Sequence, residues 1–154
     1  MLLIPPPIHQ ANPVRAPLPE PSRQALLEAL DDERKAEARY RAVLAKFGDV
    51  RPFNRIADAE ARHQDELLSL CRWHGVAVPS DPWKAHPPAA PDSLEAACAE
   101  GVRSEEANLA MYDRLLAAVK EPDLRAAFLR LQAASRDHHL PAFRACAGAT
   151  PRKP

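Results

Sequence analysis

Glu60 and His63 place a carboxylate and an imidazole where a helix would normally carry core residues. The surrounding segment has no glycine or proline, and its apolar stripe runs from Phe53 through Ile56 to Leu67 in steps of three and four. Glu60 and His63 lie on the same stripe. Because residues three apart are neighbours on a helix, this pair is able to clamp one metal ion.

Four long helices are predicted to position such groups, over residues 22–47, 52–74, 92–120 and 122–147. No alternating β-branched run or hairpin turn argues for strands. The expected class is therefore all-α. Residues that typically start or end helices mark the boundaries: Ser22, Gly48, Gly75, Asp92 with Glu95, and Pro122.

Proline-rich segments divide the chain. Residues 1–21 carry seven prolines and little apolar surface, so we expect a disordered arm, and residues 148–154 form a short tail. The linker at 76–91 is long enough to cross a whole bundle, whereas the other connections are short and favour antiparallel pairs. The prediction is a four-helix bundle over residues 22–147, made of two antiparallel hairpins joined by a long Pro-rich crossover.

Each predicted helix has an inward stripe that is apolar at both ends and polar in the middle, without any Lys or Arg. Buried carboxylates without a cation cost several kcal/mol each. They must be protonated, reach solvent or surround a cation, and the charge arithmetic favours metal ions. Flanking arginines are the alternative partners: Arg34, Arg62, Arg103 and Arg136. The polar stripe members are Glu33, Glu37, Tyr40, Glu60, His63, Glu105, Asn108, Tyr112, Ser135 and His138.

The two halves of the chain also look duplicated. Glu33 and Tyr40 recur 72 residues later as Glu105 and Tyr112. His63 of the second helix recurs 75 residues later as His138 of the fourth. A pseudo-twofold relation would bring corresponding residues to one central level.

Several motifs resemble a known family. E-R-K-A-E-A-R-Y followed by E-A-R-H is similar to the rubrerythrin branch of the ferritin-like superfamily. F-G-D-V-R-P-F-N-R-I-A-D-A-E-A-R-H, E-E-A-N-L-A-M-Y-D and H-L-P-A-F resemble a small bacterial ferritin-like family of unknown function, over residues 24–146. The resemblance implies a ferritin-like bundle with a di-iron carboxylate site, built from two Glu and two Glu-x-x-His motifs.

Carried onto this chain, the resemblance implies four metal ligands: Glu33, Glu60, His63 and Glu105. In the fourth helix Ser135 stands where a Glu is expected, so either the second metal position is weakened or Glu37 substitutes. One of two neighbouring imidazoles completes the set. Stripe spacing places His138 first, and the H-L-P-A-F motif favours His139.

Further residues are expected around the ligands. Tyr40 and Tyr112 are candidates for hydrogen bonds to ligand carboxylates, or for plain core aromatics. Asn108 and Ser135 are the other candidates for this outer layer.

The implied cofactor is iron, with manganese or zinc as alternatives, as one or two ions. The implied function is metal binding with oxidoreductase activity, peroxidase- or ferroxidase-like, on O2, peroxide or Fe(II). The alternative is a non-catalytic, metal-stabilised helical interaction or stress module. No C-x-x-C rubredoxin module is present, so redox turnover would need an external electron donor. A homodimer is one candidate assembly.

Composition narrows the partners. Across 154 residues the formal net charge is zero and no basic stripe stands out, which argues against nucleic acid. No apolar run approaches the ~20 residues of a membrane span, and the N-terminal MLLI is too short for a signal-peptide core. We therefore expect a cytoplasmic protein. Its three widely spaced cysteines predict small buried side chains without a disulfide framework.

Overall fold

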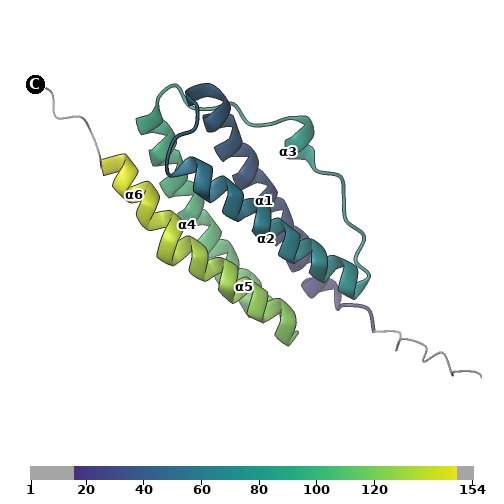
Figure 1. Cartoon of the computed structure of the whole chain (residues 1–154). Helices are drawn as coiled ribbons and strands as arrows, with labels where there is room; N and C mark the ends of the chain where they lie inside the picture. Colours follow the sequence, from purple (N-terminus) through teal and green to yellow (C-terminus); the bar gives the residue numbers. More distant parts are fainter. Residues whose placement is uncertain (1–15, 149–154) are drawn as a thin grey trace, which may run out of the picture.

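The computed structural model describes residues 16–148, and every regular element in that range is helical (Figure 1). The all-α class is confirmed. Of the predicted arm and tail, residues 1–15 and 149–154 lie outside the described residues. Within the described range, no helix has both the length and the apolar character needed to cross a bilayer. The elements are α1 (Glu20–Phe47), α2 (Phe53–His74), α3 (Pro82–Ala85), α4 (Leu94–Ala118), α5 (Pro122–Ala134), the π-helical turn η1 (Ser135–His139) and α6 (Leu140–Gly148).

α1 and α2 form the first helix pair and pack along each other (Figure 1). Both helices end at the glycines that were predicted to terminate them, Gly48 and Gly75. Gly75 has a φ of 66°, in the left-handed region that glycine enters without steric cost. The Val76 amide donates to the Cys71 carbonyl at 2.8 Å, which satisfies one of the last carbonyls of α2. The chain therefore leaves α2 sharply and enters the crossover.

The start of α1 differs from the prediction. The helix begins at Glu20, with Pro19 as its N-cap residue and Pro21 in the first turn, where proline is well tolerated. The predicted N-cap, Ser22, lies inside the helix and is buried. Its hydroxyl donates to Glu121 Oε2 at 2.6 Å, so it connects α1 to the start of α5 instead of capping its own helix.

The Pro-rich crossover between α2 and α4 contains one short helix, α3, which the proline count did not predict. The Asp81 carboxylate caps it by accepting a hydrogen bond from the Trp83 amide at 2.9 Å. α4 is capped in the same way by Ser93, whose Oγ accepts from the Ala96 amide. The predicted start at Asp92 is one residue too early.

The second helix pair consists of α4 and the chain that returns along it through α5, η1 and α6. A single fourth helix was predicted, but a π-turn interrupts it, with the Leu140 amide donating to the Ser135 carbonyl five residues earlier. Pro141 gives a physical reason. It has no amide hydrogen, and in an α-helix its ring would collide with the Asp137 carbonyl four residues before it. The wider turn relieves that collision and adds one residue to the register.

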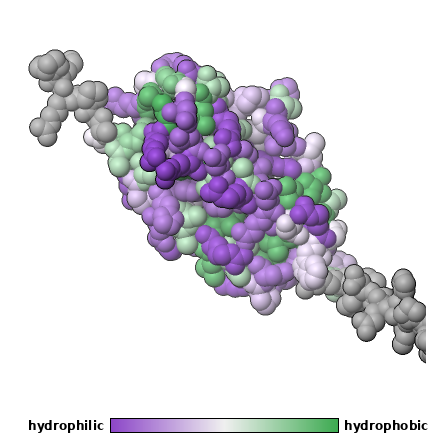
Figure 2. All heavy atoms as spheres, viewed as in Figure 1, coloured by the Kyte–Doolittle hydropathy of each residue, from purple (hydrophilic) through white to green (hydrophobic). Residues whose placement is uncertain are grey.

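Two apolar clusters fill the interior, one toward each end of the long helices. The first includes Leu30, Leu67 and Phe128, and the second includes Phe53 and Phe143. The two helix pairs meet through contacts of α1 with α4 and of α2 with α5. The face drawn in Figure 2 is mostly hydrophilic, interrupted by small hydrophobic patches. Most apolar residues toward the ends of the predicted stripes are buried or half-buried, although Leu94 and Ala145 are exposed, and the polar middle lies between the two clusters.

Gly101 allows α4 and α6 to approach closely. A Cβ added there would lie 2.6 Å from the Phe143 ring, which is fully buried and has no room to move. We expect Gly101→Ala to destabilise the fold by about 1–2 kcal/mol, because overpacking of about 1–3 kcal/mol outweighs the ~1 kcal/mol gain in helix propensity. Urea unfolding measures the change. Gly148→Ala, whose added methyl group meets nothing within 4 Å, is the control, and an equally small effect at both positions would contradict the prediction.

Two cysteines contradict the prediction of unpaired, buried thiols. Cys98 at the start of α4 and Cys146 in α6 form a disulfide across 48 residues of sequence, with Cα atoms 5.7 Å apart. That separation is typical of natural disulfides. Cys71 is the free, buried cysteine of the described residues. The bond closes the second helix pair at the end where Phe143 packs on Gly101.

Candidate metal centre

Three carboxylates and two imidazoles converge between the two apolar clusters. Glu33 comes from α1, Glu60 and His63 from α2, Glu105 from α4 and His139 from η1. The three glutamates are at most 2% exposed. The structure therefore brings together all four ligands predicted outside the fourth helix, with one imidazole from that helix.

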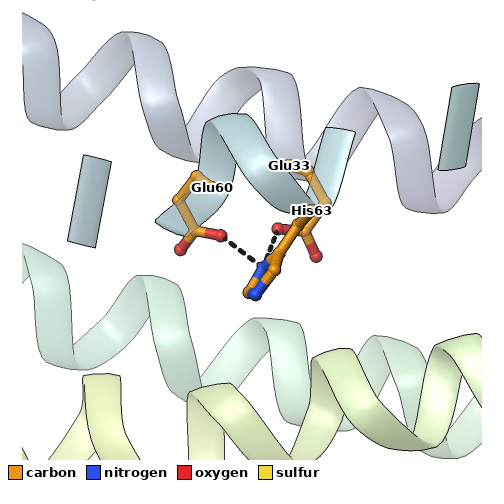
Figure 3. A group of neighbouring side chains, drawn as sticks. All are labelled: Glu33, Glu60 and His63. Carbon is orange, nitrogen blue, oxygen red and sulfur yellow. Dashed lines mark hydrogen bonds and ion pairs between the residues drawn. The ribbon is translucent and has the colours of Figure 1, made fainter. Parts of the chain in front are cut away.

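Glu60 stands at the centre of the cluster. Its Oε2 is 2.9 Å from His63 Nδ1, and its Oε1 is 3.1 Å from His139 Nδ1. It belongs to two three-residue groups: one with Glu33 and His63 (Figure 3), the other with Glu105 and His139. Within each group the potential ligand atoms lie within 4.8 Å of one another. The geometry offers two adjacent positions for a cation that share one carboxylate.

The imidazoles face these carboxylates on both sides of Glu60. His63 Nδ1 also lies 3.1 Å from Glu33 Oε2, and the two imidazole rings stack with centroids 5.7 Å apart. His139 Nδ1 lies 3.6 Å from Glu105 Oε2, yet it forms no hydrogen bond with either neighbouring carboxylate. This buried nitrogen is close enough to both carboxylates for an ion pair when the imidazole is protonated, but it is aligned with neither for a hydrogen bond.

Two tyrosines fix the outer glutamates from the opposite helix pair. Tyr112 on α4 donates its hydroxyl to Glu33 Oε1 at 2.6 Å, and Tyr40 on α1 donates to Glu105 Oε1 at the same distance. Each outer glutamate thus has one oxygen held by a tyrosine and the other facing an imidazole. Both tyrosines were candidates for hydrogen bonds to ligand carboxylates, but neither had an assigned partner. That each tyrosine bonds the glutamate of the other helix pair was not predicted, although it follows the 72-residue duplication.

No Lys or Arg of the described residues forms an ion pair with the three glutamates of the cluster. Within residues 16–148 the ion pairs of the three glutamates involve imidazoles alone. The flanking arginines that offered an alternative lie elsewhere: Arg34 donates to the Pro79 carbonyl and Arg136 pairs with Asp137. The carboxylates therefore depend on protons or on a cation supplied from outside the chain.

Burial and mutual charge shift the titration of these groups. Burial, together with the charge of Glu60, raises the pKa of Glu33. Burial also acts to raise the pKa of Glu60, but the neighbouring imidazoles outweigh it and hold that pKa below its usual value. Burial favours neutral imidazoles, yet the facing carboxylates raise the pKa of His63 to about 10 and that of His139 to about 9. Without another cation, protonated imidazoles balance part of the negative charge.

Asp32 is a half-buried carboxylate that the stripe analysis missed. It accepts a hydrogen bond from Asn108 Nδ2 at 2.8 Å, so the predicted outer-layer residue Asn108 contacts Asp32 and not a glutamate of the cluster. Burial raises the pKa of Asp32 to about 6, against the opposing effect of Asn108, and the charges of Glu33 and Glu105 add to the rise. The sequence D-D-E at 31–33 could have indicated this, because an acidic residue directly before Glu33 lies close to it on the helix.

Two predicted site residues, Glu37 and Ser135, supply no atom to the cluster. Glu37 lies outside the cluster, where it accepts from Gln64 Nε2 at 2.6 Å and pairs with Arg41. Glu37 lies one helical turn after Glu33, and its side chain is on the side of the first helix pair that faces the crossover. Ser135 is buried but supplies no atom to either group.

His139, and not His138, lies in the cluster. His138 is exposed, whereas His139 is only 4% exposed. The spacing argument assumed an uninterrupted α-helix from Leu131 onward, in which residue 138 shares the face of Ser135. The π-turn adds one residue between them and rotates His139 into that place. The alternative from the H-L-P-A-F motif is the one whose placement agrees with the structure.

A groove of about 390 Å³ between α2 and the η1–α6 segment reaches both imidazoles of the cluster, His63 and His139. Arg55, Arg62 and His138 also line it, and the rest of its wall is apolar. No carboxylate of the described residues lines this groove. The groove therefore reaches the imidazole edge of the cluster, while the three glutamates stay buried behind it, and the fixed charges along the groove are positive.

Comparison with known proteins bears on the fold alone. No family model matches the chain, and neither does any curated protein. Among solved structures, the crystal structure of hypothetical protein MJ0754 from Methanococcus jannaschii is similar, with a TM-score of 0.77 over 90% of this chain and 85% of that one. The two sequences are 21% identical. The helical arrangement described above therefore occurs in an archaeal protein that carries no assigned function.

Proposed function

We propose that this chain is a ferritin-like metalloprotein that holds two transition-metal ions in the middle of its bundle and reduces dioxygen or peroxide there. The observation that carries the proposal is the position of Glu60, shared by two Glu–His groups that no Lys or Arg of the described residues neutralises. Two divalent cations would offset the charge of the three buried glutamates and take the place of the protons that the imidazoles and Glu33 otherwise hold.

The donor set fits iron, with manganese and zinc as alternatives, because all three accept mixed carboxylate and imidazole ligands. Glu33 and His63 would hold one ion, Glu105 and His139 the other, and Glu60 would serve both. His139 Nδ1, which is buried and has no aligned hydrogen-bond acceptor, supports this assignment. Ser135 contributes no carboxylate, so each position relies on two ligands of its own and the shared one. Bound iron would supply the electrons that reduce the oxidant.

The positive charge of the groove beside His63 and His139 bears on which substrate can reach the site. Positive fixed charge attracts anions and opposes cations on their way to a site. The guanidinium groups of Arg55 and Arg62 have no ion-pair partner among the described residues, so their charge stays available to the groove. This charge opposes Fe(II) as a substrate on this route, whereas neutral O2 and hydrogen peroxide meet no such barrier. We therefore favour O2 and peroxide as the substrates, with an external protein or small molecule as electron donor.

Metal analysis followed by redox assays tests this function. We expect about two ions per chain after loading with Fe(II) or Mn(II), and turnover of peroxide or O2 by the iron form. Glu60→Ala/His63→Ala should lose both metal and turnover. Glu37→Ala, which removes a carboxylate outside the cluster, is the matched control and should keep both. Stoichiometric zinc without turnover would instead support a metal-stabilised interaction module.

Tyr112 acts through Glu33 as a positioning residue. Removing its hydroxyl in Tyr112→Phe leaves one oxygen of Glu33 without its donor, and loss of such a supporting hydrogen bond lowers metal affinity by about 10–100-fold. Competition titration against a chelator measures the shift. Tyr40→Phe should reproduce it at Glu105. A variant that is less stable but binds metal with unchanged affinity would show that the hydroxyl serves the core alone.

A further inference from the structure

The crossover is held to α1 at three places. Arg34 Nη1 donates to the Pro79 carbonyl at 3.0 Å, and Trp83 Nε1 donates to Asp31 Oδ1 at 2.9 Å. Near the other end, Lys46 Nζ donates to the Pro91 carbonyl at 2.8 Å. Between these attachments the chain runs beside α1 (Figure 1). The crossover is therefore fixed in place along the helix and not a free linker.

A cavity of about 730 Å³ lies between the crossover and the first helix pair. Its floor on α1 is a stripe of small residues, Ala38, Ala42 and Ala45, at the spacing of one helix face. Its opposite wall includes Pro87 and Pro88, whose stiff backbone resists collapse onto the helix. This volume and apolar lining are those of small-molecule sites, which span about 300–1,000 Å³.

Trp83 gives the cavity a fixed aromatic wall. Its indole nitrogen is bonded to Asp31, and the ammonium of Lys35 lies 5.0 Å from the ring centroid. Both contacts restrict the rotation of the ring. An indole held in this way offers a flat apolar surface at little entropic cost to binding.

The polar lining of the cavity is positive on balance. Its two carboxylates already have partners: Glu37 pairs with Arg41 at 3.2 Å, and Asp81 caps α3. Lys84 also lines the cavity, and its ammonium forms no hydrogen bond or ion pair with the described residues. Lys46 adds a second ammonium, which contacts the Pro91 carbonyl and the Phe47 ring and whose ion-pair partner is the fully exposed Asp92 at 3.7 Å. Positive charge is thus left over for a ligand.

We propose that this cavity binds a small organic anion, with an apolar or aromatic body on the alanine stripe and Trp83 and an acidic group near Lys84 and Lys46. None of the five residues of the metal cluster lines the cavity. The site is therefore separate from the metal centre, and the proposal stands whether or not that centre binds metal.

Two dyes that share one body test the proposal on the full-length chain. 1-Anilinonaphthalene-8-sulfonate carries an acidic group, and N-phenyl-1-naphthylamine has the same rings without it. We expect the sulfonate to bind at one site per chain, about tenfold more tightly than the neutral dye. Equal affinity for the two dyes, or no saturable binding of the sulfonate, would overturn the proposal.

Variants locate the site. Ala42→Leu fills the floor of the cavity and should weaken both dyes at least about tenfold, whereas Ala117→Leu, at an exposed position of α4, should change neither. Lys84→Glu should weaken only the sulfonate. Far-ultraviolet circular dichroism checks that each variant is folded. Dye binding that survives in folded Ala42→Leu would place the dyes elsewhere and reject the cavity.

Discussion

His139→Ala is expected to remove one of the two metal positions, while His138→Ala, at the adjacent residue, leaves both intact. His139 is the one imidazole that faces Glu105, and its Nδ1 lies 3.1 Å from Glu60. Even supporting residues around a metal cost about 10–100-fold in affinity when they are lost, so loss of a direct ligand should cost more. Elemental analysis of both variants after identical metal loading measures the difference.

The comparison is sharp because the two variants differ only in which face of η1 loses its imidazole. Both remove the same atoms, and both lie in the groove that leads to the cluster. His138→Ala therefore controls for loss of charge and of bulk at the entrance. Metal content that falls equally in both variants would contradict the register given by the π-turn. A larger fall in His138→Ala would restore the α-helical reading of this segment.

The first helix pair shows which site residues the spacing of polar residues can predict. Glu33, Glu60 and His63 come from helices without an internal break, and there the three-four pattern placed every one of them correctly. Gly48 and Gly75 ended those helices as predicted, because a residue free to adopt positive φ is the local requirement. The same pattern also put Glu37 of the unbroken α1 on this stripe, and Glu37 lies outside the cluster, so spacing alone does not decide which polar members of a stripe converge.

The fourth helix shows why spacing can fail. An unbroken α-helical stripe through Ser135 and His138 would continue to Ala142 and Ala145, but the buried residues are His139 and Phe143. The π-turn adds one residue and so rotates every later side chain to a different face of the helix. A pattern that assumes 3.6 residues per turn throughout cannot reveal such a turn. Phe143 was the available signal, since an α-helical register would have left this large aromatic side chain facing water.

The disulfide was missed for a related reason. Cys98 lies on the inward stripe of its own helix, but the uninterrupted register turned Cys146 away from it. With the π-turn in place the two meet at one end of the second pair, beside the contact of Phe143 with Gly101. Contacts that depend on the relative rotation of two helices follow from packing, and a pattern read along one helix does not contain them.

Reducing this disulfide is expected to lower the free energy of unfolding by about 4 kcal/mol. In the chain-entropy model the effect grows with the closed loop, and a separation of 48 residues gives about that value. For a chain of this size the change corresponds to a fall in melting temperature on the order of 10 °C. Urea and thermal unfolding of metal-free protein, with and without a phosphine reductant, measure both quantities.

The variant Cys146→Ala separates loss of the covalent bond from loss of packing, because Cys146 is only partly buried. It should unfold like the reduced wild type, and the reductant should have no further effect on it, since both treatments remove the same bond. Cys71→Ala is the control, because that thiol is free and its variant should keep the full response to reductant. A response to reductant that persists in Cys146→Ala would show that the stabilisation has another source. If none appears in the wild type, the loop that the bond closes is already restrained by the packing of Phe143 against Gly101.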